Sequence, residues 1–152
     1  MLRFACEVLA AGLGTLAFAV LFHVPGRYYL RCALTGAAGW LVFLALRPGL
    51  TAIPATFFAT LAVVALSRFS SVQRRCPVTI FLISGIFPLV PGLGIYHTAY
   101  YTVTGDLAAA GSTGFFTIKT AAAMVLAILL GFELPAGLFR RLAGAPAPKP
   151  RV

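Results

Sequence analysis

Long apolar runs separated by short polar interruptions dominate the chain. The five runs cover about residues 4–24, 30–46, 50–66, 77–103 and 115–139. Each approaches or exceeds the ~20 residues with which an α-helix crosses the hydrocarbon core of a bilayer. Turn formers and arginine fill the first two interruptions, Pro25-Gly26-Arg27 and Arg47-Pro48-Gly49. The pattern predicts an all-α integral membrane protein with five transmembrane helices in one domain, residues 1–139, followed by a basic Pro/Ala-rich tail, residues 140–152.

Composition excludes the soluble classes of protein. Hydrophobic residues make up 61% of the 152 residues and charged residues only 10%, against about 25% charged residues in a typical soluble domain. The net charge is +9, from 12 Lys/Arg and 3 Asp/Glu. In a soluble protein this excess would suggest a nucleic-acid partner. In a membrane protein it instead reflects the retention of basic residues on the cytoplasmic side, where they meet anionic lipid, so we expect a bilayer and no nucleic acid.

The distribution of basic residues predicts the orientation. One side of the membrane receives Arg27, Arg31, Arg68, Arg74, Arg75, Arg140, Arg141, Lys149 and Arg151. The other side receives only Arg3 and Arg47. The richer side is cytoplasmic by the positive-inside rule. The N-terminus is therefore expected outside and the C-terminus in the cytoplasm, in a multi-pass protein of a bacterial inner membrane.

The first apolar run also has a competing interpretation, a cleaved signal peptide. Glu7 interrupts the start of this run, and its basic flank follows the run. A signal peptide carries its basic residues before the apolar stretch. A membrane-spanning helix is therefore the favoured interpretation.

The fourth run holds an unusual cluster of helix breakers. Pro88 and Pro91 lack the backbone N–H, and Gly92 and Gly94 relax the backbone further. We expect this span to break near the bilayer centre. Broken membrane helices are tolerated where they are buried in protein or line a cavity, and in transporters they mark the substrate site. The cluster therefore indicates either a solute pathway or a structural kink satisfied by neighbouring side chains.

Aromatic and polar side chains follow this break. Tyr96 shares a helix face with Tyr100, and His97 shares one with Tyr101, because residues four apart are neighbours on a helix. Tyr96 and His97 are candidates for the substrate pathway, with His97 a gate or proton-handling group. The same residues also fit the aromatic belt of the outer membrane interface.

Ionisable residues within the spans are the remaining candidates for chemistry. Lys119 lies about four residues into the fifth predicted span, where it either reaches the outer surface or attracts the carboxylate of a solute. A pair between Glu7 and Lys119 is a further hypothesis. Glu7, Asp106 and Glu133 are the acids available for proton coupling.

Small residues predict where the first two helices meet. Ala10 and Gly14 are four apart in the first run, and Ala33 and Ala37 are four apart in the second. Small residues at this spacing let membrane helices approach closely. We expect these pairs to form helix contacts, either within the chain or with a partner.

The sequence resembles the second-half domain of the threonine/serine exporter family. The resemblance is carried by the stretch from Pro77 to Tyr96, continuing to Gly105-Asp106, and its distinctive part is Pro88-Leu89-Val90-Pro91-Gly92. It implies that Pro88, Pro91 and Gly92 form the family's membrane-centre motif. It also implies a subunit of a proton-driven exporter of threonine, serine or a dicarboxylate such as succinate. The implied partners are a larger subunit of the same family, a second copy, or both, and the solute is small and anionic or zwitterionic.

Two other function classes were weighed. A non-transporting membrane scaffold or assembly subunit would tolerate changes that straighten the fourth span. An intramembrane enzyme has little support, because Ile83-Ser84-Gly85 lacks the preceding glycine of a nucleophile turn. The three cysteines are far apart and fit small apolar fillers. We expect no catalytic residue, no metal site and no cofactor.

Overall fold

The computed structural model describes residues 2–135, and every element assigned within this range is helical. The elements are α1 (Leu2–Leu21), η1 (Gly26–Tyr28), α2 (Tyr29–Leu46), α3 (Ala52–Arg74), α4 (Thr79–Ile86), η2 (Phe87–Leu89), α5 (Gly92–Thr104) and α6 (Leu107–Glu133). Helices α1, α2, α3 and α6 are long and apolar enough to cross a membrane, and the bent pair α4–α5 gives a fifth candidate when it is counted as one span. The predicted all-α membrane class is confirmed. The predicted tail, residues 140–152, lies outside the described residues.

Two helices are longer than the apolar pattern predicted. Helix α3 continues beyond residue 66 to Arg74, because Ser67 and Ser70 are buried in the bundle and do not form a loop. Helix α6 begins at Leu107 and not at 115. Gly105 ends α5 with a φ of 84°, and the Asp106 side chain caps α6, so the expected loop is a two-residue turn.

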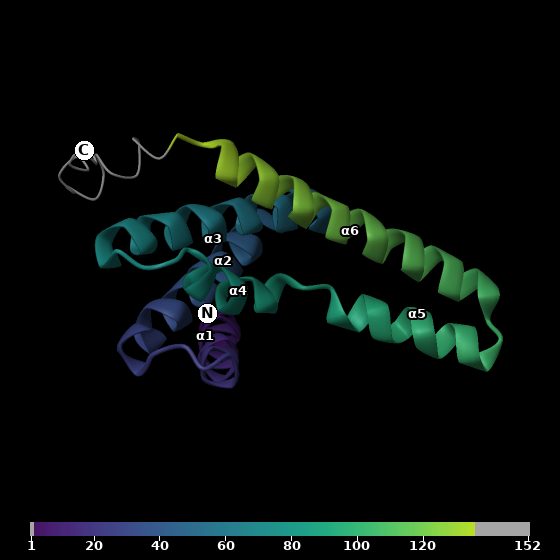
Figure 1. The fold of residues 1–152 in the computed structure, drawn as a ribbon. Helices are drawn as coiled ribbons and strands as arrows, with labels where there is room; N and C mark the ends of the chain where they lie inside the picture. Colours follow the sequence, from purple (N-terminus) through teal and green to yellow (C-terminus); the bar gives the residue numbers. More distant parts are fainter. Residues whose placement is uncertain (1, 136–152) are drawn as a thin grey trace.

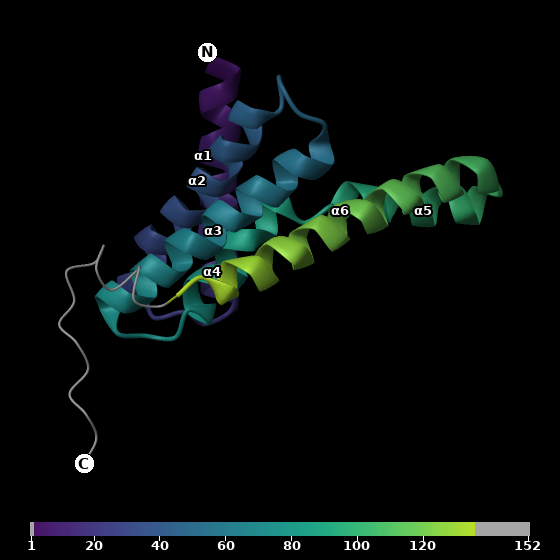
Figure 2. The same ribbon diagram turned by 90° about the horizontal axis from the view of Figure 1, so that it is seen from above.

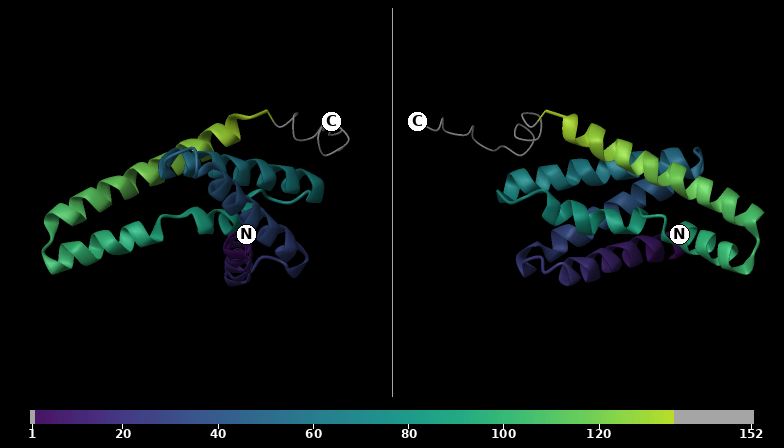
Figure 3. Two further views of the ribbon diagram at one scale, coloured as in Figure 1. Left: turned by 180° about the vertical axis from the view of Figure 1, so that it is seen from behind. Right: turned by 45° about the vertical axis from the view of Figure 1, so that its right-hand side comes forward.

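Helices adjacent in sequence pack on one another from α1 to α4, whereas α5 packs chiefly on α6. Helix α1 packs on α2, α2 on α3, and α4 lies against both α2 and α3, while α6 crosses α3. Figures 1 and 2 show α5 and the first half of α6 projecting from this bundle as a hairpin, and Figure 3 shows the same from two further directions. Within the described chain, α5 buries none of its residues. The apolar core therefore lies where α3 crosses its neighbours, around Ala59, Val63, Val64, Leu82, Leu89 and Met124.

Small residues do bring α1 and α2 together, but not all of the predicted ones take part. A Cβ atom at Gly12 would lie 3.4 Å from Ala37 Cβ, and one at Gly36 would collide with Thr15. Gly14, by contrast, has nothing within 4 Å of that position in the part of the chain that the structure describes. Gly12 and Thr15, not Gly14, form the contact face of α1.

We expect Gly36→Val to destabilise the bundle while Gly14→Val is tolerated. Both changes place the same β-branched side chain in a helix, so their intrinsic helix preferences are similar. Only the variant at Gly36 forces α1 away, and overpacking of this kind costs about 1–3 kcal/mol. Thermal unfolding of the two variants in detergent measures the difference. Equal stability would show that the α1–α2 contact does not require glycine.

Arg68 of α3 forms hydrogen bonds with the C-terminal end of α6. Its guanidinium donates hydrogen bonds to the carbonyl oxygens of Gly131, at 2.6 Å, and Phe132, at 2.9 Å. The last carbonyls of a helix lack partners within the helix, and a cation there also interacts favourably with the helix dipole. Arg68, counted in the sequence only as a cytoplasmic charge, thus also completes the hydrogen bonding of a membrane helix.

Candidate functional site

The fourth span is broken where the prolines predicted. Helix α4 gives way to the short turn η2, which contains Pro88, and α5 starts at Gly92 with Pro91 at its N-cap. The segments before and after the break differ in direction by 51°. Both prolines remove a backbone donor that a continuous helix would need. The predicted interruption of the span is confirmed.

A cavity of about 570 Å³ lies beside this break. Its walls are the break itself from Pro88 to Leu93, the end of α2, the start of α3 and the middle of α6. This volume falls within the range of about 300–1,000 Å³ that is common for small-ligand sites. Most of its lining is apolar, and four side chains add polar atoms: Trp40, Arg47, Thr56 and Thr120.

Two of these side chains, the exposed Arg47 and the half-buried Trp40, are donors without an acceptor among the described residues. Arg47 follows the last residue of α2, and its guanidinium carbon lies 5.6 Å from the ring centre of Phe43. Within residues 2–135 it forms no ion pair with an acid. The indole Nε1 of Trp40 is buried and has no hydrogen-bond acceptor among the described residues. A guanidinium and an indole N–H at one cavity suit an anionic group, above all a carboxylate.

The two threonines supply acceptors. Thr56 and Thr120 are both buried, and each hydroxyl donates to a carbonyl of its own helix, at 2.8 Å to Ala52 and 3.0 Å to Phe116. Their hydrogens are used, and their oxygen lone pairs remain free to accept. The cavity therefore combines anion-binding donors with acceptors suited to an ammonium or hydroxyl group.

The N-terminus of α5 adds to the positive character of the cavity. Gly92 and Leu93, its first residues, line the wall, and no side chain caps this end of the helix. The first N–H groups of a helix lack partners within it and carry a partial positive charge. The N–H of Gly92 donates to the Val90 carbonyl oxygen at 2.7 Å, so among the described residues of the cavity wall it is the N–H of Leu93 that the break presents beside Arg47 and Trp40.

The predicted pathway residues divide into two groups. Pro88, Pro91 and Gly92 line the cavity, whereas Gly94, Tyr96, His97 and Lys119 do not. Gly94 has a packing role: it lets α5 approach α6 so closely that a side chain there would collide with Thr117.

The aromatic side chains of α5 point away from the bundle. Tyr96 and His97 are exposed. The expected face pairs exist, with ring centres 6.3 Å apart for Tyr96 and Tyr100 and 6.2 Å apart for His97 and Tyr101. Their exposure on the projecting hairpin favours a contact with lipid or another protein over a contact with the cavity.

The ionisable candidates are scattered. Lys119 is exposed at the thirteenth of the 27 positions of α6, with its Nζ 4.5 Å from the ring centre of Phe115. The expected pair with Glu7 does not form, although both residues lie in the described range. The carboxylate of Asp106 accepts a hydrogen bond of 3.0 Å from the Ala109 N–H and so caps α6. Glu7 and Glu133 are exposed on α1 and at the end of α6.

Four cavity residues were missed by the sequence reasoning. Arg47 carried a signal, because it is one of only two basic residues on the predicted outer side. Trp40 is the only tryptophan of the chain, but it lies within the second apolar run, six residues before its end, and belongs to no recognisable motif. Thr56 and Thr120 gave no signal that separates them from other threonines.

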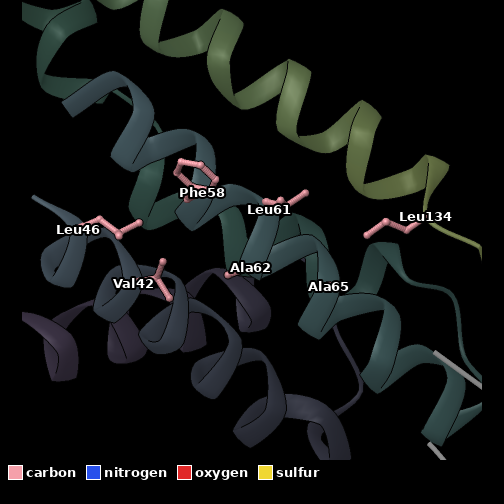
Figure 4. Close-up of a pocket in the computed structure, with 7 residues that line it drawn as sticks. All are labelled: Val42, Leu46, Phe58, Leu61, Ala62, Ala65 and Leu134. Atoms are coloured by element: carbon pink, nitrogen blue, oxygen red, sulfur yellow. The ribbon is translucent and has the colours of Figure 1, made fainter. Parts of the chain in front are cut away.

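A second hollow, of about 500 Å³, lies on the flank of α2 and α3 beside Leu134. Figure 4 shows the side chains that line it, all of them apolar: Val42, Leu46, Phe58, Leu61, Ala62, Ala65 and Leu134. It offers no hydrogen-bonding side chain to orient a polar solute. The cavity at the helix break is therefore the better candidate site.

Comparison with known proteins identifies the family. Residues 7–132 match the family described as Threonine/Serine exporter, ThrE. The chain belongs to the threonine/serine exporter family. This family is one of transporters and not of enzymes. The break and the cavity of this exporter-family chain both lie inside the matched region.

Two curated relatives match this exporter-family chain, and one of them is named as an exporter of this kind. It is 27% identical over 128 residues to a probable threonine/serine exporter of Mycobacterium tuberculosis. This match covers 84% of the present chain and 24% of the M. tuberculosis protein. It is 30% identical over 97 residues to an uncharacterized protein of Haemophilus influenzae, covering 63% of this chain and 33% of that protein. The chain thus spans a third or less of these relatives. No solved structure matches it.

Proposed function

We propose that this chain is a membrane subunit of an exporter of small amino acids of the threonine/serine type, and that the cavity at the α4–α5 break binds the solute. The observation that carries the proposal is the set of donors without internal acceptors at a broken membrane helix. Arg47 and the indole N–H of Trp40 line the same cavity as the α5 N-terminus. Broken helices whose half-helix ends face a solute are the usual substrate sites of secondary transporters.

The polar groups favour a zwitterion over a dicarboxylate. A solute carboxylate can accept from Arg47, Trp40 and the N–H of Leu93, while its ammonium donates to Thr56 and Thr120. Succinate has two carboxylates, and Arg47 is the only cationic side chain among the described residues of the cavity wall. Succinate is therefore the second candidate substrate.

Movement of the α5–α6 hairpin about the break is the proposed conformational change. Residues Pro88–Gly92 connect α5 to the bundle, and α5 has α6 as its principal neighbour. The second half of α6 packs on α3, so movement of the hairpin also shifts the contact between α6 and α3. Hinges are a few residues at element ends that absorb backbone rotation. Rotation there changes the side from which the cavity is reached.

The proposal includes a partner and an energy source. Relatives are three to four times as long as the matched segment, so we propose that a larger subunit supplies the remainder and contacts the exposed hairpin around Lys119. A second copy of this chain is the alternative partner. We propose the bacterial inner membrane, with the N-terminus outside, and proton coupling through Glu7, Asp106 or Glu133.

The decisive experiment combines purification with transport. The tagged chain is purified from its native membrane with whatever accompanies it, reconstituted in vesicles and assayed with labelled threonine, serine and succinate, with and without a proton gradient. We expect a larger membrane protein to copurify and threonine or serine to be transported faster than succinate. A complex that binds and moves none of these solutes would favour the scaffold function.

Replacing Pro88 and Pro91 together by alanine distinguishes a transporting subunit from a non-transporting scaffold. The double variant restores two backbone donors and lets the span straighten, so we expect transport to fall about tenfold while folding is kept or improved. Pro25→Ala, in the exposed α1–α2 connection, is the matched control and should transport normally. Transport by the double variant at the rate of the control would favour the scaffold.

A further inference from the structure

Helix α3 carries a row of buried hydroxyl groups that begins at the cavity. The row consists of Thr56, Thr60, Ser67 and Ser70, all of which are buried. At about 100° and 1.5 Å per residue they fall within an arc of about 80° and extend over about 21 Å. One face of α3 is therefore polar from the cavity wall, at Thr56, nearly to the opposite end of the helix.

Two hydroxyls of this row have no hydrogen-bond partner within residues 2–135. Thr60 Oγ1 and Ser67 Oγ are fully buried and make no hydrogen bond to any described residue. Most helical threonines of the chain instead donate to the carbonyl four residues earlier: Thr15, Thr35, Thr56, Thr98, Thr102, Thr117 and Thr120. Buried polar groups without partners are rare, and each points to strain, function or an unseen water.

An apolar residue separates the two unpaired hydroxyls. Val63 lies on the same face of α3, between Thr60 and Ser67, and is fully buried. It packs against glycines on two other helices, Gly39 of α2 and Gly85 of α4. At both glycines an added Cβ would lie within 3.4 Å of Val63, so the three helices are in close contact at this level. Val63 therefore closes the polar row at its middle.

We propose that this row is the polar wall of the solute's route between the cavity and the far side of the bundle, and that Val63 against Gly39 and Gly85 is its closed gate. The inference rests on the proposed transport function and adds a route and a gate to the binding site. In the open state Thr60 and Ser67 bond to the solute and to the water that accompanies it.

Isosteric removal of the two hydroxyls tests the route. In the purified complex, Thr60→Val and Ser67→Ala should each slow solute transport about tenfold, while equilibrium binding of labelled threonine stays within about twofold. Thr15→Val is the matched control, because Thr15 is equally buried but lies on α1 and has its own partner. Transport by both row variants at the rate of the control would overturn the proposal.

Arg47→Gln distinguishes failure of the route from failure of the proposed function. If this variant loses solute binding while the two row variants transport normally, the cavity is correct and the route is wrong. If Arg47→Gln also binds and transports normally, the proposed function itself fails. The two proposals therefore give separable results.

Thiol accessibility provides a second test that does not depend on transport rates. Cys6, Cys32 and Cys76 are first replaced by alanine, and Thr60→Cys or Ser67→Cys is then introduced. A small membrane-impermeant thiosulfonate should modify Thr60→Cys from the Arg47 side and Ser67→Cys from the Ser70 side. Val63→Ala should let the reagent reach Ser67→Cys from the Arg47 side as well. Absence of modification at both positions, with and without threonine, would overturn the route.

Discussion

Replacing Arg47 by glutamine should weaken solute binding about 100-fold and leave the fold intact. Hydrogen bonds to charged groups contribute about 1.5–3 kcal/mol, and loss of the upper part of this range corresponds to about 100-fold in affinity. The fold should be unaffected because Arg47 is exposed after the end of α2 and forms no ion pair within residues 2–135. Equilibrium binding of labelled threonine to the purified protein measures the loss.

Two further arginine variants distinguish the role of the guanidinium of Arg47 from a general effect of positive charge. Arg47→Lys keeps the positive charge but loses the planar pair of donors, so we expect an intermediate loss of about tenfold. Arg3→Gln removes the other basic residue on the predicted outer side, away from the cavity, and should bind normally. Equal losses for Arg3→Gln and Arg47→Gln would reveal a general effect of charge and refute a binding role for Arg47.

Replacing Lys119 by leucine should lower the free-energy cost of inserting α6 into the membrane. The variant should nevertheless lose binding of the proposed partner, and with it transport. A charge at the centre of a membrane helix costs about 2.5–3.5 kcal/mol on insertion scales. Lys119 lies at the middle of a helix that is about 40 Å long at 1.5 Å per residue, too far from either end for its side chain to reach readily. It is exposed and, within the described residues, has only the ring of Phe115 as a neighbour for its charge. A carboxylate on a partner helix would compensate this cost.

Copurification is the measurement for Lys119. We expect Lys119→Leu to reach the membrane at wild-type levels or above, to keep its thermal stability and to lose the partner protein and transport. Lys119→Arg should retain both, and Ile118→Leu, at an adjacent exposed position, should have no effect. A Lys119→Leu variant that still copurifies with a partner and transports would exclude this lysine from the interface.

The sequence predicts those features whose causes are local. Pro88 and Pro91 break the span wherever its neighbours lie, because the missing N–H groups belong to the prolines themselves. The ends of α3 and α6 were missed for the opposite reason. Ser67 and Ser70 look like loop residues until α3 buries them, and the Gly105-Asp106 turn is shorter than its polar surroundings suggested.

The candidate site was only partly predictable. The break supplies one wall, and the sequence placed it correctly, but the polar groups come from α2, α3 and α6, which meet only in three dimensions. Tyr96 and His97 pair on α5 with Tyr100 and Tyr101 as expected, yet both are exposed and neither reaches the cavity. Spacing along one helix therefore predicted which residues share a helix face. Which face lines the cavity depended on how the helices pack, and the sequence did not show this.

Helix α5 buries none of its residues within the described chain, and this exposure affects how the chain assembles in the membrane. Helices α1, α2 and α3 contact their neighbours in sequence and can associate as they leave the ribosome. Helices α5 and α6, joined by a two-residue turn, can enter the bilayer together as a preformed pair. Because the distal part of this pair packs little against the bundle, we expect it to be the segment of lowest local stability in an isolated copy. An isolated copy should therefore be cleaved by membrane proteases first at this hairpin, so that the cellular level of the chain is expected to follow that of the proposed partner.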